Sequence, residues 1–250
     1  MKDGKIHTQV EKGIGRLSLY HPKRNAMPKS LLQKLETAIQ QLGADEAVKV
    51  IVLQSEGTRA FCAGASLDEL RSIRDFDAAK AFFMGFARVI HAMRSCPKLI
   101  IGRIQGKAVG GGVGLLAATD YALAAKFASV RLSELAIGLG PFVIEPAIRR
   151  KIGASAMGAI AIDADTWKPA TWALEKGLYQ SLYPNLDELD EAVNRLANTL
   201  SERSTAAMRA LKTVLWADTA DWLDTMAQRA ATSGKLLLSD CAQAMLQKDI

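Results

Sequence analysis

The sequence predicts an α/β fold in which a mostly parallel sheet carries helices on its faces and is followed by a C-terminal helical region. Two observations predict it. In the first half, apolar or β-branched runs alternate with a segment of helical periodicity, whereas from residue 141 onward the pattern is helical only. Strand–helix–strand order favours parallel strands, because a parallel pair needs a crossover connection. A chain of 250 residues is long enough to bury a core of its own.

Four short runs predict strands. Residues 14–20 and 48–55 are apolar or β-branched and bounded by turn residues, and residues 99–104 and 121–125 follow the same pattern. Residues 28–42 lie between the first two strands and predict a helix. Its apolar side chains recur at helical spacing and are Leu31, Leu32, Leu35, Ala38, Ile39 and Leu42. Pro28 suits the first turn of a helix.

The second half predicts amphipathic helices. Residues 186–200 place leucine, valine and alanine on one face, and Asp187 and Glu188 in the first turn favour the positive end of a helix. Ser204 is a candidate N-cap for the next helix. We therefore expect a core over residues 1–190 and a helical region over 191–250. Such an apolar region should pack on the core or on another subunit.

Composition excludes several protein classes. The charge of +6 and the pI of about 9.2 permit a polyanionic substrate, but basic residues form no run and only 6% of residues are aromatic, which argues against a nucleic-acid partner. The longest uncharged run, residues 108–119, contains four glycines and is too short for a membrane span. Three cysteines without CxxC spacing and no apolar leader predict a cytoplasmic protein.

Three segments are candidates for chemistry: residues 60–67, 105–116 and 132–141. The first two each join a strand to a helix through small residues, where exposed backbone N–H groups favour negative charge. The third places Glu134 in an otherwise apolar stretch. Two sets of backbone donors and one carboxylate are what enolate chemistry needs, because the donors stabilise an oxyanion while the carboxylate moves a proton.

Other site types are poorly supported by the sequence. The three histidines are scattered, so we expect no metal site. Residues 110–115 do not follow the dinucleotide-binding pattern in its usual setting, and no Walker motif or GxSxG elbow occurs. Cys62, a small residue in a packed turn with no histidine near it in sequence, is expected to be structural.

These motifs resemble the crotonase superfamily, the enoyl-CoA hydratase/isomerase family, over nearly the whole chain. The resemblance rests on four segments in family order: residues 21–27 (HPKRNAM), 61–65 (FCAGA), 106–120, and Ser133-Glu134 followed by 138–141 (GLGP). It implies a ββα-spiral core, a homotrimer or a dimer of trimers, and an acyl-CoA thioester as substrate. It also implies that the helical region over 191–250 serves trimerisation and covers coenzyme A. Coenzyme A would then be part of the substrate, and no separate cofactor is implied.

The resemblance also assigns site residues. It implies that the N–H groups of Ala65 and Gly111 form the oxyanion hole and that Glu134 is the acid–base group. It places coenzyme A contacts on two short segments. Their residues are Lys23, Arg24, Ala26, Ala63, Ser66 and Leu67.

Two departures from the family pattern bear on the reaction. Family hydratases carry a second glutamate three residues after the oxyanion glycine, where this chain has Gly114, and Ser66 replaces the usual aspartate. With Glu134 as single base, we expect enoyl-CoA double-bond isomerisation. Hydration of an enoyl-CoA, such as a methylglutaconyl-CoA-like ester, is the alternative. Decarboxylation of an acyl-CoA and a non-catalytic acyl-CoA- or RNA-binding role stay open. Gly114 and Phe142 are candidates for shaping the acyl pocket, and Glu145 is a second acid to consider.

Overall fold

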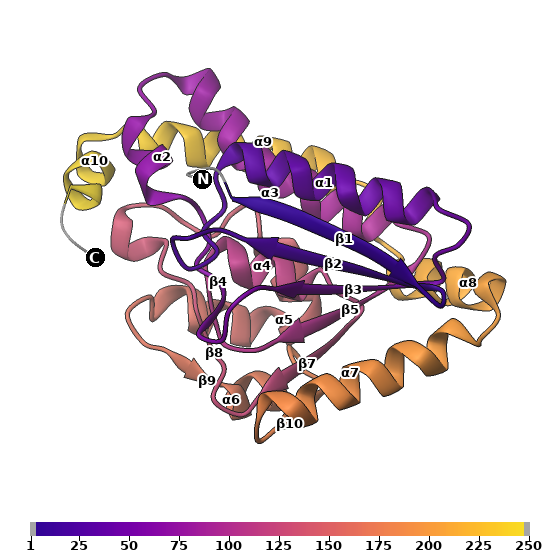
Figure 1. Ribbon diagram of the computed structural model, residues 1–250. Helices are drawn as coiled ribbons and strands as arrows, with labels where there is room; N and C mark the ends of the chain where they lie inside the picture. The colour runs from indigo at the N-terminus through magenta and orange to yellow at the C-terminus, as the bar shows by residue number, and fades with distance from the viewer. Residues whose placement is uncertain (1–3, 248–250) are drawn as a thin grey trace.

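A computed structural model describes residues 4–247 and shows a twisted six-stranded sheet with helices on both faces (Figure 1). The strand order is β1-β2-β3-β5-β7-β10. Only β1 and β2 are antiparallel, and the other neighbours run parallel. The strand bounds are β1 Lys5–Glu11, β2 Ile14–Tyr20, β3 Val50–Ser55, β5 Leu99–Ile104, β7 Tyr121–Ala125 and β10 Ser181–Tyr183.

The central strands are apolar along their length because both faces of the sheet are covered. In β3 every residue except Gln54 is buried, and in β5 every residue except Arg103 is buried. Helices α1 (Lys29–Ala44) and α3 (Phe76–Ser95) pack on one face, and α7 (Leu186–Ser201) packs against β3, β5 and β7 on the other. Near-continuous apolar strands are typical of a parallel sheet buried in this way.

A second, smaller sheet holds the candidate site. Its order is β4-β6-β8-β9, with β4 at Ala60–Cys62, β6 at Lys107–Val109, β8 at Ser129–Arg131 and β9 at Lys168–Pro169. Strands β4, β6 and β8 are parallel, so the loops that leave their carboxyl ends emerge at one edge. These loops belong to the three segments that the sequence selects.

The remaining helices complete the spiral and its C-terminal part. They are α2 Leu67–Ser72, α4 Gly111–Ala117, α5 Glu145–Ile162, α6 Ala170–Glu175, α8 Thr205–Leu215, α9 Trp222–Leu237 and α10 Asp240–Leu246, with a 3-10 turn, η1, at Leu135–Ile137. Helix α9 lies along α3 (Figure 1), and α10 packs against η1 and α2. No helix within residues 4–247 has the length and apolarity to cross a bilayer.

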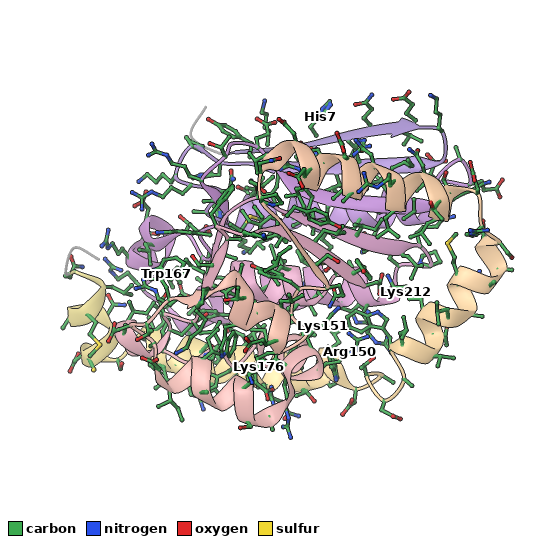
Figure 2. All side chains as sticks on the ribbon, turned by 90° about the horizontal axis from the view of Figure 1, so that it is seen from below. His7, Arg150, Lys151, Trp167, Lys176 and Lys212 are labelled. Atoms are coloured by element: carbon green, nitrogen blue, oxygen red, sulfur yellow. The ribbon has the colours of Figure 1, made fainter. Side chains whose placement is uncertain are left out.

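A buried ion pair attaches α8 to the core. Lys212 Nζ lies 3.0 Å from Asp120 Oδ2, and both side chains are about 95% buried. The indole N–H of Trp216 donates to Asp120 Oδ1 at 2.6 Å, and the guanidinium of Arg150 lies over the Trp216 ring. Lys151 donates to the carbonyl of Asp120. Figure 2 shows Arg150, Lys151 and Lys212 gathered at this junction. Separating Lys212 from Asp120 would leave an uncompensated buried charge. The ion pair therefore holds α8 against the core.

The predicted strands and helices of the first half are confirmed, with α1 starting one residue after Pro28. Three details differ. Residues 5–11 form β1, which the sequence does not predict because its side chains are mostly exposed and show little apolar alternation. The expectation of helices only after residue 141 is wrong, since β9 and β10 add short strands to the two sheets. The predicted boundary at residue 190 lies inside α7, which is continuous from Leu186 to Ser201.

Candidate active site

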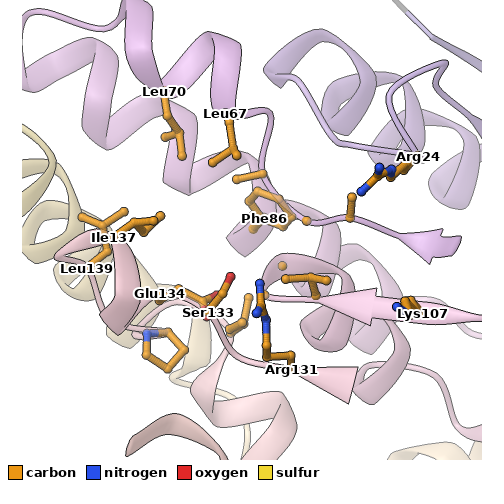
Figure 3. Close-up of a pocket in the computed structure, with 18 of the residues that line it drawn as sticks. Arg24, Leu67, Leu70, Phe86, Lys107, Arg131, Ser133, Glu134, Ile137 and Leu139 are labelled. Carbon is orange, nitrogen blue, oxygen red and sulfur yellow. The ribbon is translucent and has the colours of Figure 1, made fainter. Parts of the chain in front are cut away.

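A cavity of about 840 Å³ lies where the loops after β4, β6 and β8 meet, between α2, α3 and the C-terminal helices (Figure 3). Its lining is mostly apolar and includes Leu67, Leu70, Phe83, Phe86, Ile137, Leu139, Phe142, Val143 and Ile144. Among the described residues that line it, Glu134 is the only carboxylate. An apolar enclosure with few polar groups is the usual form of a small-molecule site.

Glycine at position 64 allows the first two loops to approach. Its φ of +81° is left-handed, and a Cβ there would lie 2.6 Å from the carbonyl oxygen of Val109 and 3.2 Å from the amide nitrogen of Gly111. A side chain would therefore push the loops apart. The close contact brings the neighbouring Ala65 beside the start of α4.

Two backbone N–H groups in this region have no acceptor within residues 4–247. They belong to Ala65 and to Gly111, the first residue of α4, whose N–H has no intrahelical partner. Phe86 lies directly over Gly111, where a Cβ would fall 2.2 Å from the ring. Two free donors beside an apolar cover can bind an oxygen that gains negative charge, and the start of a helix adds a favourable dipole.

Glu134 lies next to these donors, between β8 and η1. A Cβ on Gly110 would lie 2.7 Å from Glu134 Oε1, so the carboxylate rests against the turn that precedes Gly111. Its Oε2 is enclosed and has no hydrogen-bond partner. Burial raises the pKa of Glu134 to about 7, against a smaller lowering by a backbone hydrogen bond and by the charge of Arg131. Near neutral pH, this group can both accept and return a proton.

Hydrocarbon occupies the position where a second carboxylate would have to be accommodated. A Cβ on Gly114 would lie 2.5 Å from Ile144 Cγ2, and Ile144 is 4% exposed. Ile144, and not Gly114, lines the cavity. The glycine is therefore required by the packing of Ile144, and a larger residue at position 114 needs Ile144 to move.

Comparison with known proteins identifies the family. Residues 9–245 match the sequence model of the enoyl-CoA hydratase/isomerase family. The chain belongs to the enoyl-CoA hydratase/isomerase family. It is 28% identical over 214 residues to a "Probable enoyl-CoA hydratase" of Bacillus subtilis, an alignment that covers 85% of this chain and 82% of that protein.

Two further comparisons concern a relative that is named for another reaction and a solved structure that shares the fold. The chain is 27% identical to a Mycobacterium tuberculosis protein named "(7aS)-7a-methyl-1,5-dioxo-2,3,5,6,7,7a-hexahydro-1H-indene-carboxyl-CoA hydrolase", over 83% of this chain and 82% of that one. The enoyl-CoA hydratase structure from Bacillus halodurans superposes with a TM-score of 0.89 over 97% of this chain and 98% of that one. At 22% identity, this likeness shows the fold, which confirms the predicted crotonase-like ββα spiral.

Of the six residues that the resemblance assigns to coenzyme A, three line the cavity and three do not. Arg24, Ala63 and Leu67 line the cavity. The other three are outside its lining. Lys23 forms an ion pair with Asp68, and Ala26 is buried. Ser66 caps α2, where its Oγ accepts from the N–H of Glu69 at 3.4 Å.

Two other candidate residues are not placed for chemistry. Glu145 lies outside the cavity lining and forms ion pairs with Arg149 and Arg229. Cys62 is fully buried, and burial raises the pKa of its thiol to about 12, so it stays protonated. Within residues 4–247, no cluster of three or more His, Cys, Asp or Glu side chains could hold a metal ion.

Sequence reasoning missed several cavity residues, notably Phe86, Arg131 and Trp167. Phe86 and Trp167 come from outside the three loops, and nothing local in the sequence links them to Glu134. Arg131 could have been found, because it is the only charged residue in the stretch 127–133 and lies only three positions before Glu134.

Proposed function

We propose that this family member isomerises the double bond of an enoyl-CoA thioester, with Glu134 as the single acid–base group. One observation carries the proposal. Within the described part of the chain, the cavity has one carboxylate beside two free backbone donors, and Ile144 fills the space over Gly114 with hydrocarbon.

The reaction begins at C2 of a 3-enoyl thioester. Ionised Glu134 removes the C2 proton, and the electron pair delocalises onto the thioester oxygen to give a dienolate. The N–H groups of Ala65 and Gly111 donate to that oxygen as its charge grows. The now protonated Glu134 returns the proton at C4, which leaves a 2-enoyl thioester of unchanged composition and restores the carboxylate.

The same arrangement disfavours addition of water. Hydration places a water molecule at C3 and moves its proton while C2 is protonated, which benefits from a second carboxylate to orient the water. Ile144 offers no hydrogen bond in that region, so a water molecule there would lose part of its hydration. Isomerisation needs no such partner.

Hydration is the second candidate function, because the Bacillus subtilis relative is named for it. In that case Glu134 alone would orient and activate the water.

For the coenzyme A part, we propose that Arg24 meets the phosphates while the backbone at Ala63 and Leu67 follows the pantetheine arm. Arg24 is exposed at the mouth of the cavity, and the N–H of Ala63 donates to its carbonyl at 3.1 Å. This bond ties the Arg24 turn to the loop that follows β4. A guanidinium at the mouth suits phosphate.

The test is a panel of matched 3-enoyl- and 2-enoyl-CoA esters with products analysed by liquid chromatography and mass spectrometry. Isomerisation changes the retention time of a 3-enoyl ester without changing its mass, hydration adds water, and decarboxylation removes carbon dioxide. We expect isomerisation of the 3-enoyl esters to exceed hydration of the 2-enoyl esters, and both to need Glu134. Faster hydration than isomerisation across the panel would overturn the proposal in favour of the hydratase.

A further inference from the structure

Arg131 is a charged side chain in the cavity that the proposed reaction does not use. It ends β8, three residues before Glu134, and is half-buried in the cavity lining. Its Nε is enclosed and has no hydrogen-bond partner. Within residues 4–247, no carboxylate lies within 4.0 Å of its guanidinium nitrogens, Glu134 included. Figure 3 shows the side chain standing beside Ser133 and Glu134.

An aromatic ring holds this guanidinium in place. Arg131 Cζ lies 5.1 Å from the centroid of the Trp167 ring, and Lys107 Nζ lies 4.6 Å from the same centroid. Cation–π contact on a half-buried tryptophan restricts the arginine, which lowers the conformational entropy that binding would cost. All three residues line the cavity. Together they form a preorganised cationic wall.

The charges around the cavity are unbalanced. Among the described residues, its lining contains four cationic side chains against the single carboxylate of Glu134. The four are Arg24, Arg59, Lys107 and Arg131. A guanidinium that is partly removed from water without a counterion is costly, and this cost is recovered when a ligand supplies an anion in bidentate geometry.

The position of Arg131 indicates which part of the ligand carries that anion. Strand β6 separates β8 from β4, whose following loop is bonded to the Arg24 turn. Arg131 is therefore on the opposite side of β6 from the strand whose loop carries the proposed coenzyme A contacts. It is close to Glu134 in sequence and in space, where the acyl part of the thioester reacts (Figure 3).

We propose that Arg131 binds a carboxylate on the acyl group, so that the substrates are thioesters of dicarboxylic acids. This inference rests on the proposed function for the orientation of the thioester. It names Arg131 as a specificity-determining residue, with Trp167 positioning it.

The test measures binding without reaction. Saturated succinyl- and glutaryl-CoA, each beside its monomethyl ester, are titrated by calorimetry into the wild-type protein, Arg131→Gln and a matched control, Arg88→Gln. Arg88 is exposed on α3 and outside the cavity lining. We expect one free acid to bind the wild type and the control roughly 10- to 100-fold more tightly than its ester, the range of a charge-assisted hydrogen bond. Arg131→Gln should reduce that ratio to about one.

Further arms distinguish an acyl carboxylate from a coenzyme A phosphate as the anion that Arg131 meets. Pantetheine thioesters lack the nucleotide phosphates, so the same ratio should persist with them. If Arg131→Gln instead weakens acid and ester equally, the proposal is overturned, and loss of the effect with pantetheine thioesters would identify a phosphate as the anion. Arg131→Lys keeps the charge without the bidentate fork, so its ratio of acid to ester affinity should lie between those of the wild type and Arg131→Gln. This variant also keeps the test usable if Arg131→Gln folds poorly.

Because succinyl- and glutaryl-CoA have neither a double bond nor a carboxylate on C2, they cannot be isomerised, hydrated or decarboxylated, and these outcomes are independent of whether the enzyme isomerises or hydrates. An equal affinity of the wild type for every acid and its ester refutes the carboxylate site and leaves the isomerase proposal standing. Conversely, a preference for the free acid that depends on Arg131 survives a failure to isomerise any 3-enoyl ester.

Discussion

Replacing Glu134 by glutamine removes one ionisable group from the cavity while keeping its shape. If this carboxylate moves the proton, turnover of every reactive thioester should fall by roughly 10²- to 10⁴-fold, the contribution of a general acid–base group. Binding of saturated acyl-CoA should change little, because the oxyanion donors are backbone groups of Ala65 and Gly111. In the wild type, kcat/KM should rise about tenfold per pH unit below pH 7 and level off above it, since burial raises the pKa of Glu134 to about 7.

The same substitution should change stability in a pH-dependent way. The folded-state pKa of about 7 lies above the ordinary value of 4.5, so folding favours the protonated acid. The stability from this group is fully present below about pH 4.5 and is lost as the pH rises through 7. The difference corresponds to about 3 kcal/mol. Glu134→Gln should therefore stabilise the protein at pH 8.5 and have little effect at pH 4.

Urea unfolding at these two pH values, with Glu145→Gln as control, measures the effect. Glu145 is also a glutamate with an apolar neighbourhood in sequence, but it lies outside the cavity and is paired with Arg229. The control should retain turnover. The reasoning is refuted if Glu134→Gln retains full activity, or if its effect on the free energy of unfolding is the same at pH 4 and pH 8.5.

Three further outcomes are expected. Gly114→Glu should lower the free energy of unfolding by about 1–3 kcal/mol through overpacking against Ile144. The rate of hydration should increase only when Ile144→Ala is added, and an increase with Gly114→Glu alone would contradict this. Arg24→Gln should weaken acyl-CoA esters more than acyl-pantetheine esters, and equal losses would argue against a phosphate contact. Light scattering at micromolar concentration should show a trimer or hexamer that Val214→Glu weakens, since Leu211, Val214 and Leu215 are 47–71% exposed on α8; a wild-type monomer would refute it.

Local patterns were sufficient to predict most elements of the fold. Buried parallel strands such as β5 and β7 are continuous apolar runs, and α7 has a clear apolar face, so periodicity identifies them. The short strands β9 and β10 carry no such signal, because two or three residues contain no period. They are strands only because β8 and β7 already lie beside them. Strand β1 is a similar case, since pairing with β2 defines it while its side chains are mostly exposed.

The same distinction between local patterns and tertiary contacts applies to the candidate site. Glu134, the glycine-rich turns and the cap at Ser66 depend on backbone geometry within a few residues, and the sequence by itself determined them. The tertiary structure alone decided that Phe86 covers Gly111, that Ile144 occupies the space over Gly114 and that Trp167 holds Arg131. These contacts join residues far apart along the chain, and a side chain's packing partner depends on where the whole spiral places it. In the proposed function, such contacts select the acyl group, whereas the local backbone supplies the donors for an enolate.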